Sequence, residues 1–244
     1  CEHMGNFPTF PVKGKLKMSP DNILNYRINI SEEKGHAGYY EAMVQEDIKA
    51  KLTVTERTGM ASYEYPADQQ YGTVIIGGGI SATPIEQAAI VITAPNKCEG
   101  YAEGGNFCGL RTPYKVYFVA EFDTDALESG TWKRNELKPN TTFAEGEYSG
   151  VYFTFDVNKK KNIQYKIGVS YVSVENAREN LKAENTGWDF LQIQNQAESK
   201  WNHYLGKIEV EGCEVEPAVR GNIFNLRQHA QRGAGAPARP VAHC

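Results

Sequence analysis

The chain has 244 residues and a formal net charge of −4 at pH 7. Nucleic-acid-binding proteins usually carry clustered Lys and Arg, so this charge balance argues against that class of protein. The run Lys159–Lys161 follows Asp156 and Asn158, and we interpret it as an exposed hairpin tip rather than a binding patch. No stretch approaches the roughly 18 consecutive apolar residues of a membrane span. The length suits one large domain or two small ones.

Residues 8 to 172 are predicted to form a succession of short strands. Ile48, Ala50, Leu52 and Val54 alternate with Lys and Thr in IKAKLTVTE, the period of two that indicates one buried face and one face in water. The other predicted strands cover residues 38–44, 61–66, 72–78, 86–93, 114–123, 150–157 and 162–172.

Polar turns separate these strands, and no helix is predicted between them. The turn signals are Glu56-Arg57-Thr58-Gly59, Gly77-Gly78-Gly79, Pro95-Asn96 and Lys138-Pro139-Asn140. Many short strands joined in this way are typical of antiparallel sheets packed face to face. We therefore predict a large two-sheet antiparallel β-sandwich, with more strands than a small immunoglobulin-type domain.

A first helix is predicted directly after the last strand. Ser173 is placed to cap its N-terminus, its apolar face is formed by Val174, Ala177 and Leu181, and Gly187 follows its end.

A second helix is predicted after Asp189, which caps it with Gln192 in the capping-box position. Its apolar residues recur with helical spacing at Phe190, Ile193, Ala197, Trp201, Leu205 and Ile208. We expect this stripe to pack against the body of the domain. A ligand role for Trp201 is the less favoured alternative.

The two ends of the chain differ in character from the rest. From Cys213 onward the sequence is rich in Ala, Arg, Gly and Pro without an apolar period, so we predict a disordered tail. That tail is either a natural linker or a non-native ending, and we favour the second. The start CEHMGNFPTF has no initiator Met, which is typical of the middle of a gene, so the missing signal peptide says little about localisation.

The chain has five cysteines, of which only Cys98 and Cys108 are close in sequence. Gly104-Gly105 between them is predicted to be a two-residue hairpin turn, which places Tyr101 opposite Cys108. Cys98 then lies about 10 Å away and points to the other face. A disulfide needs Cα atoms within about 7 Å, so we predict free thiols.

Motifs for catalysis or metal binding are absent from the sequence. GGGISATP lacks the G-x-G-x-x-G spacing of a phosphate loop, and the five His are scattered, so we predict neither a phosphate site nor a His-based metal site. The carboxylates in or beside strands are interpreted as solvent-face residues rather than catalysts. They are Glu41, Glu56, Glu64, Glu103, Glu121 and Asp123.

The segment CEGYAEGGNFCG is the best local candidate for ligand binding. Tyr101 and Phe107 could offer an aromatic face to a sugar, and the glycines would allow close backbone approach. An ordinary hairpin remains the favoured interpretation of this segment.

Four stretches give the chain a resemblance to the N-terminal domain of glycoside hydrolase family 92, over roughly residues 1 to 212. They are GNFPTFP (5–11), GYYEAMVQEDIKAKLTVTERTGMASYEYP (38–66), EGGNFCG with YKVYFVAEFD and GTW, and VSYVSVENARENLKAENTGWDF with KWNHYLGKIEVEG. The last stretch is the most specific.

The resemblance implies a β-sandwich like that of galactose mutarotases, a helical linker and a large (α/α)6 barrel. Family members are secreted or periplasmic, calcium-dependent, inverting α-mannosidases that degrade glycans. Their general acid, general base and most calcium ligands come from the barrel, which this sequence does not encode. We therefore expect no catalytic residue and no calcium binding from this chain alone.

The resemblance also suggests where two surfaces lie. Cys1, Glu2 and Asn6 continue a pocket-shaping loop of the family, so they are expected at the rim of the sugar pocket. The second predicted helix would meet the barrel through the interdomain face Phe190, Ile193, Trp201 and Leu205.

The expected organisation is a sandwich over residues 1–172, a helical linker over 173–212 and a tail over 213–244. The expected function is that of the pocket-forming half of a family 92 α-1,2-mannosidase, with a mannose-containing glycan as its ligand. Two alternatives stay open: a stand-alone carbohydrate-binding module, or a structural fragment that associates through an exposed apolar linker face.

Overall fold

The computed structural model describes residues 6–20, 29–78, 85–105 and 112–207, and within them the strands form two antiparallel sheets. The five-stranded sheet has the order β1 (Thr9–Lys13), β6 (Tyr71–Gly77), β13 (Ser149–Asp156), β10 (Glu128–Lys133) and β11 (Glu136–Pro139). The nine-stranded sheet has the order β12 (Phe143–Glu145), β7 (Ile85–Ala94), β8 (Lys97–Gly104), β9 (Tyr114–Phe122), β14 (Asn162–Ser170), β5 (Thr58–Glu64), β4 (Ile48–Val54), β3 (Tyr39–Val44) and β2 (Ile30–His36). The predicted two-sheet sandwich followed by two helices is confirmed.

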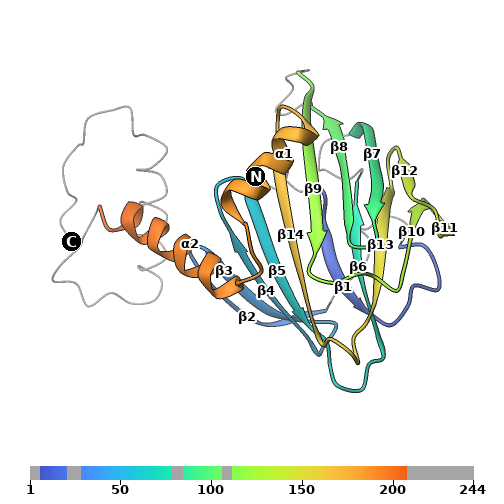
Figure 1. Cartoon of the computed structure of the whole chain (residues 1–244), viewed down its shortest axis with the longest axis horizontal. Helices are drawn as coiled ribbons and strands as arrows, with labels where there is room; N and C mark the ends of the chain where they lie inside the picture. Colours follow the sequence, from blue (N-terminus) through green and yellow to red (C-terminus); the bar gives the residue numbers. More distant parts are fainter. Residues whose placement is uncertain (1–5, 21–28, 79–84, 106–111, 208–244) are drawn as a thin grey trace.

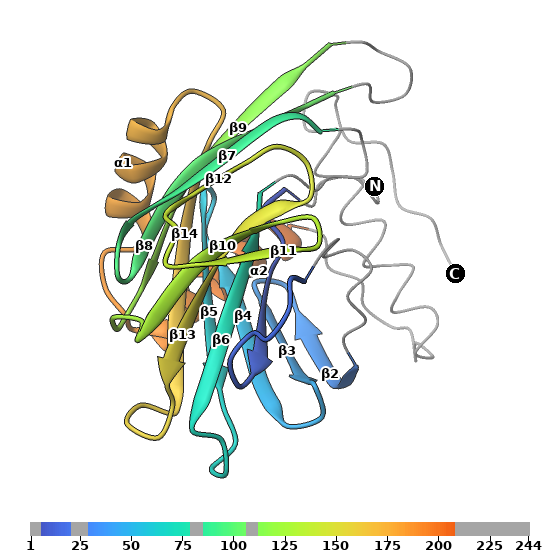
Figure 2. The same ribbon diagram turned by 90° about the vertical axis from the view of Figure 1, so that its right-hand side faces the viewer.

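The main core lies between the two sheets, which pack face to face (Figure 2). At its centre the Phe122 ring of β9 lies 4.9 Å from Phe153, 5.0 Å from Phe155 and 5.3 Å from Tyr165, measured between ring centroids. Large aromatic rings bury much apolar surface and favour such tilted contacts. The alternation of apolar residues in β9, β13 and β14 therefore gives the sandwich its interior.

Two helices, α1 (Val174–Glu184) and α2 (Phe190–Leu205), lie on the outer side of the nine-stranded sheet (Figure 1). Helix α1 packs over β14 and β9, while α2 packs over β3, β4 and β5. Both predicted N-caps are confirmed: the Ser173 hydroxyl accepts from the Asn176 N–H, and the Asp189 carboxylate accepts from the Gln192 N–H. No helix among the described residues is long and apolar enough to span a membrane.

Glycines let both helices approach the sheet closely. A Cβ at Gly168 of β14 would lie 2.5 Å from the Ala177 carbonyl oxygen and 2.9 Å from the Leu181 Cβ of α1. Gly38, in the turn between β2 and β3, has φ of +88° and would meet the Ala197 Cβ of α2 at 2.9 Å. Small residues at these two contacts therefore set the distance between the sheet and its helices.

The sequence prediction missed several strands and one turn. Segment 97–104 is strand β8, and it pairs with β9 so that Gly104 lies opposite Tyr114 and Tyr101 opposite Tyr117. The predicted two-residue turn at Gly104-Gly105 is therefore wrong, because a longer connection joins the two strands. β1, β2, β10, β11 and β12 also have no counterpart among the strand ranges predicted from apolar alternation.

Cys98 is a free thiol on the inner face of β8, fully buried in the main core, as predicted. Burial raises the pKa of this thiol well above its usual range. Cys108 lies outside the described residues, so its state stays a prediction.

The apolar residues of β4 alternate as predicted, but only two of the four are buried. Ile48 and Ala50 are in the core, whereas Leu52 is 38% exposed and Val54 is 47% exposed. Thr53 on the outer face is buried instead, and its hydroxyl donates to the Gly38 carbonyl at 2.7 Å. The sequence pattern thus predicted which side these residues face, but not that the cover over them ends.

We predict that Gly168→Ala will lower the free energy of unfolding by about 1–3 kcal/mol, because its methyl group would overlap α1. Urea denaturation followed by circular dichroism measures this change. Gly187→Ala is the matched control, since a Cβ there meets nothing nearer than the Asp189 nitrogen at 4.0 Å. Equal stability of both variants and the parent would contradict the close-approach argument.

Candidate functional site at the open end of the sandwich

One end of the sandwich collects the start of β9, the ends of β8 and β14, and the turn between β4 and β5 (upper part of Figure 1). The strand registers define it: Gly104 lies opposite Tyr114, Ser170 opposite Tyr117, and Gly168 opposite Thr58. We call this the open end. The first described residues of the chain lie here too, because Thr9 begins β1 opposite Ile76 near the end of β6.

Asn6 lies at the open end, where its side-chain oxygen accepts a hydrogen bond from the Tyr114 hydroxyl at 3.3 Å. Its Nδ2 is buried and has no hydrogen-bond partner among the described residues. A buried amide donor without a partner is costly, so such groups often mark a place for a ligand or water. Of the three residues predicted at the pocket rim, only Asn6 is described. Cys1 and Glu2 lie outside the described residues.

Phe7 fixes the direction in which the chain reaches Asn6. It is buried and has φ of 59°, a left-handed conformation that a bulky residue adopts only when its surroundings enforce it. Its ring centroid lies 4.2 Å from that of Phe118 on β9, and its carbonyl accepts from the Thr9 hydroxyl at 3.1 Å. Packing on the inner face of the large sheet therefore holds this strained turn in place.

A hydroxyl contact joins the two sheets directly below this turn. The Thr9 and Tyr165 hydroxyl oxygens lie 3.3 Å apart, which links β1 to β14. Burial raises the pKa of Tyr165 well above its usual range, so this phenol stays neutral and remains able to donate.

The two predicted aromatic sugar contacts are not brought together with Asn6. Tyr101 stands on the outer face of β8, since its neighbours Gly100 and Ala102 point into the sandwich. There its ring centroid lies 6.1 Å from that of Tyr117, and the Lys115 Nζ lies 4.3 Å from it. Tyr101 and Asn6 are therefore on opposite sides of the large sheet. Phe107 lies outside the described residues.

Most of the strand carboxylates are engaged with lysines. Glu41 pairs with Lys49 at 3.2 Å, Glu103 with Lys115 at 2.9 Å, Glu121 with Lys97 at 3.0 Å and Asp123 with Lys160 at 2.7 Å, while Glu56 pairs with Lys200. Glu64 is exposed. The interpretation as solvent-face residues agrees with these contacts except at Asp123, whose side chain is only 6% exposed and accepts from the Gln164 N–H.

The same contacts bear on calcium, which prefers six to eight oxygen ligands. Within the part of the chain that the structure describes, no group of three or more His, Cys, Asp or Glu side chains could hold a metal ion. The described residues therefore do not fit a calcium site of this kind. The expectation that the chain alone does not bind calcium stays a prediction.

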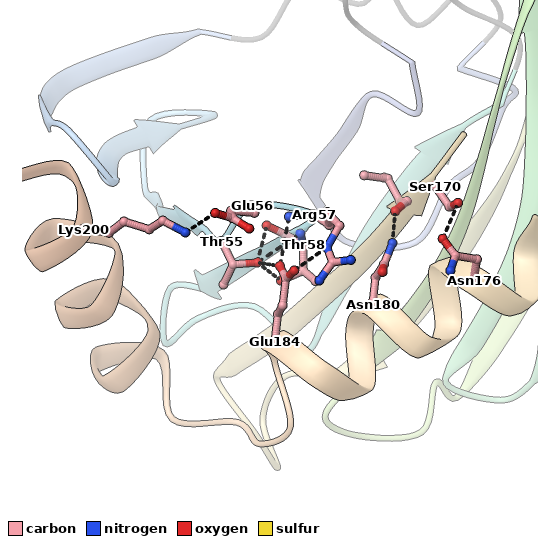
Figure 3. Close-up of polar contacts among 10 residues, drawn as sticks. Thr55, Glu56, Arg57, Thr58, Ser170, Asn176, Asn180, Glu184 and Lys200 are labelled. Atoms are coloured by element: carbon pink, nitrogen blue, oxygen red, sulfur yellow. Dashed lines mark hydrogen bonds and ion pairs between the residues drawn. The ribbon is translucent and has the colours of Figure 1, made fainter. Parts of the chain in front are cut away.

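A polar cluster at the open end ties both helices to the turn between β4 and β5 (Figure 3). The Glu184 carboxylate, at the end of α1, accepts from the Thr55 hydroxyl at 2.5 Å, the Arg57 Nε at 2.5 Å and the Arg57 backbone N–H at 2.9 Å. The neighbouring Glu56 pairs with Lys200 of α2. We call this group the linker clamp.

The electrostatics of the clamp favour the ionised form of Glu184. Burial alone would raise its pKa, but the hydrogen bonds from Thr55 and Arg57 outweigh burial, so the pKa of Glu184 is lowered. Further along α1, the Asn180 amide donates to the Val169 carbonyl at 2.8 Å, and the Ser170 hydroxyl bonds Asn176 at 2.8 Å (Figure 3). Helix α1 is thus bonded to β14 along much of its length.

The connection between α1 and α2, which we call the elbow, is held by Lys166 of β14. This buried lysine donates to the Asn185 carbonyl at 3.1 Å and lies 4.5 Å from the centre of the Trp188 ring, a cation–π contact. Burial lowers the pKa of Lys166, and the Glu121 carboxylate, 3.8 Å away, opposes that effect. The direction in which α2 leaves the sandwich is therefore fixed at its start.

The predicted interdomain face of α2 is largely used within this chain. Ile193 and Leu205 are buried, Phe190 and Trp201 are half-buried, and the Phe190 ring meets Tyr39 of β3 edge-on at 6.4 Å. Ile193 and Leu205 therefore do not form the exposed apolar patch expected of them, because α2 packs on β3, β4 and β5. A role for this face at a domain boundary stays a prediction.

Sequence reasoning missed Glu184, Arg57 and Lys166. Arg57 was predicted to be part of a turn, and Glu184 was not singled out. Only the spatial meeting of two segments 127 positions apart makes them a pair. A local signal did exist for Lys166, since it is a lysine with apolar neighbours near the end of a strand.

The comparisons with known proteins agree with this architecture. Residues 1–170 match the glycosyl hydrolase family 92 N-terminal domain, and residues 176–224 match the glycosyl hydrolase family 92 catalytic domain. These matches define a sandwich domain followed by the beginning of a glycosyl hydrolase catalytic domain. More particularly, the chain belongs to glycosyl hydrolase family 92.

Solved structures of this family share the fold. The inverting mannosidase BT2199 of Bacteroides thetaiotaomicron superposes with a TM-score of 0.77 at 24% identity, covering 93% of this chain and 29% of its own. The family enzyme ccman5 gives a TM-score of 0.79 at 20% identity, covering 94% and 32%. An uncharacterized secreted glycosidase of Arthroderma benhamiae is 24% identical over 91% of this chain and 32% of its own. This chain thus spans about a third of the length of these relatives.

We predict that Glu184→Gln will lower the free energy of unfolding by about 1–3 kcal/mol, because the hydrogen bonds from Arg57 and Thr55 lose their charged acceptor. Chemical denaturation measures the change. Glu179→Gln is the matched control on the exposed face of the same helix. A loss of equal size in both variants would contradict the clamp.

The clamp should also depend on pH in one direction. Because the pKa of Glu184 is lowered in the folded chain, its contribution is complete above the ordinary Glu pKa of 4.5 and is lost as the pH falls through the folded value. The stability difference between the parent and Glu184→Gln should therefore be largest near neutral pH and shrink below about pH 4. A difference that stays constant down to about pH 3 would argue against this.

Proposed function

We propose that this chain is the pocket-forming half of a family 92 α-mannosidase and that it does not turn over substrate alone. The observation that carries the proposal is the open end, where a strained turn at Phe7 presents Asn6 beside Tyr114. This is also the end at which the linker clamp holds the helices matched by the catalytic-domain family. The surface that would border a pocket and the exit toward the catalytic region therefore coincide.

The chemistry of glycoside hydrolysis supports this division of labour. An inverting enzyme needs a carboxylic acid on one side of the glycosidic bond and a carboxylate that activates water on the other side. Those two groups must face each other across the sugar. The strand carboxylates singled out in the sequence are paired with lysines or exposed, and Glu99 pairs with Arg178. The family catalytic domain is matched only over residues 176–224. We infer that the acid and base come from the remainder of that domain.

A mannose-containing glycan is the proposed ligand. A family relative, the α-mannosidase BT3965 of Bacteroides thetaiotaomicron, has been solved in complex with mannoimidazole. In this chain the Asn6 amide and the Tyr114 hydroxyl are groups that can both donate to and accept from sugar hydroxyls. The role of calcium and a periplasmic or secreted location are proposed from the family, the location with support from the Arthroderma relative described as secreted.

A stand-alone carbohydrate-binding module is the second candidate. The observation in its favour is the pair Tyr101 and Tyr117, which are half-buried neighbours on the outer face of β8 and β9. Aromatic side chains combine a large apolar surface with a polar hydroxyl, which suits the face of a sugar ring. Binding there would take place away from Asn6, so the two candidates differ in location.

We predict no release of mannose from α-1,2-linked mannobiose by the purified chain, with or without calcium. Chromatographic detection of free mannose over a long incubation measures this, with an active family 92 enzyme as positive control. Hydrolysis by this chain would overturn the proposal.

A titration with mannose, followed by NMR, separates the two candidate sites. We expect weak binding with shifts near Asn6 and Tyr114, and we expect Asn6→Ala to remove most of them. Tyr101→Ala is the matched control on the outer face and should leave those shifts in place. Shifts confined to Tyr101 and Tyr117 would favour the binding module instead.

A further inference from the structure

A row of apolar side chains crosses the outer face of the nine-stranded sheet over β12, β7, β8 and β9, on the side of α1 away from α2 (Figure 1). The strand registers bring its members together across the four strands. We call the row the outer-face stripe, and it consists of Phe143, Val91, Ala89, Tyr101 and Tyr117.

The stripe points away from the main core, because the residues that alternate with its members along each strand point into that core. Those alternating residues are buried, and they include Ala88, Ile90, Ala102, Val116, Phe118 and Ala144. Contacts between neighbouring strands account for the two tyrosines at the centre. They do not account for Phe143, which lies at the edge of the sheet and is 54% exposed.

Polar side chains border the stripe on both sides. On one side Glu99 pairs with Arg178 of α1 at 2.7 Å, and on the other side Glu103 pairs with Lys115 at 2.9 Å. The hydroxyls of Tyr101 and Tyr117 have no hydrogen-bond partner among the described residues. Donors and acceptors are therefore available along a narrow apolar row.

This arrangement suits a carbohydrate better than a protein. A sugar ring has an apolar face of C–H groups and a rim of hydroxyls, so it can stack on an aromatic ring while its rim bonds to polar neighbours. A stable protein interface usually needs about 800 Å² from each partner, with a centre poor in charged residues. The stripe is one residue wide between two charged pairs.

The length of the stripe indicates a chain of sugars rather than a single one. Neighbouring strands lie about 4.8 Å apart, so the stripe extends over roughly 14 Å from β12 to β9. One monosaccharide would contact only part of it. Tyr117 follows Tyr114 by three residues on β9, which places the stripe about 10 Å from the open end.

We propose that the outer-face stripe is a second glycan-binding surface, which holds an oligosaccharide of several mannose residues outside the pocket. This proposal rests on the proposed function for its choice of sugar. It differs from the binding-module candidate because the stripe acts in addition to the site at Asn6. It differs from that site because its ligand is a chain of sugars.

NMR titrations of the whole chain with mannose and with α-linked mannohexaose test this proposal. We expect mannohexaose to shift the signals of Tyr101, Tyr117 and Val91. Mannose at the same concentration of sugar residues should shift them little, because a single ring contacts only part of the stripe. The affinity of the stripe for mannohexaose should exceed its affinity for mannose at least fivefold.

Variants assign the binding to named side chains. Tyr117→Ala should weaken mannohexaose binding at the stripe at least fivefold, and Phe143→Ala about threefold. Phe143 is the more exposed residue and lies on the short strand β12, so its removal leaves the fold intact. Tyr204→Ala is the matched control, since this tyrosine is 43% exposed on α2. Circular dichroism verifies that each variant is folded.

Each outcome decides the proposal. It is overturned if millimolar mannohexaose leaves the stripe unshifted, or if folded Tyr117→Ala and Phe143→Ala bind as tightly as the parent. A chain that is dimeric by light scattering, and monomeric as Tyr117→Ala, would assign the stripe to a second copy and also overturn it.

The same titrations separate this proposal from the proposed function. Mannohexaose shifts on the stripe, with no mannose shifts at Asn6 and Tyr114, would support the stripe and count against the pocket. Shifts confined to Asn6 and Tyr114 with both sugars would support the pocket and overturn the stripe.

Discussion

The constraint on which this structure depends is that a nine-stranded sheet must be covered on both faces. The five-stranded sheet covers most of the inner face, and α1 and α2 cover part of the outer face. The two faces of the large sheet are packed in different ways. Inside, aromatic rings around Phe122 fill the volume between the sheets, whereas outside, Gly168 and Gly38 remove side chains so that helices can approach. The five-stranded sheet and the two helices are thus joined into one domain by the nine-stranded sheet between them.

Polar contacts then give the helices one position rather than several. Apolar packing is tolerant of small shifts, but a carboxylate that accepts three hydrogen bonds is not, because each bond has a narrow range of lengths and angles. Glu184 imposes this restriction on α1, and Lys166 imposes it on the elbow before α2. If the site forms between two bodies, as proposed for this chain, such precision determines whether the groups on each body meet at reacting distance.

The sequence predicted the sandwich and the helices because both follow from local periodicity. Alternation marked strands such as β4 and β9, and Ser173 and Asp189 marked the helix starts. It missed β8, in which Gly and Glu interrupt the apolar pattern, and β10 to β12, which are short. It could not predict the exposure of Leu52 and Val54, because alternation gives the side a residue faces but not what covers that side.

The candidate site was less predictable for a related reason. Asn6 was placed at the pocket rim through family resemblance, whereas its contact with Tyr114 joins residues 108 positions apart. Glu184 and Arg57 are likewise distant in sequence. Tyr101 was chosen from a segment interpreted as a short hairpin, and the pairing of β8 with β9 places it on the outer face of the sheet. Contacts of this kind depend on topology, which periodicity alone does not supply.

The buried position of Cys98 makes its thiol a probe of how often the core of the sandwich opens. The thiol sits in the middle of the nine-stranded sheet with no solvent contact, and its burial keeps it in the unreactive protonated form. An alkylating reagent can therefore reach it only when the core between the two sheets opens. The speed at which this one sulfur becomes labelled would report how often the centre of the sandwich opens while the rest of the population remains folded.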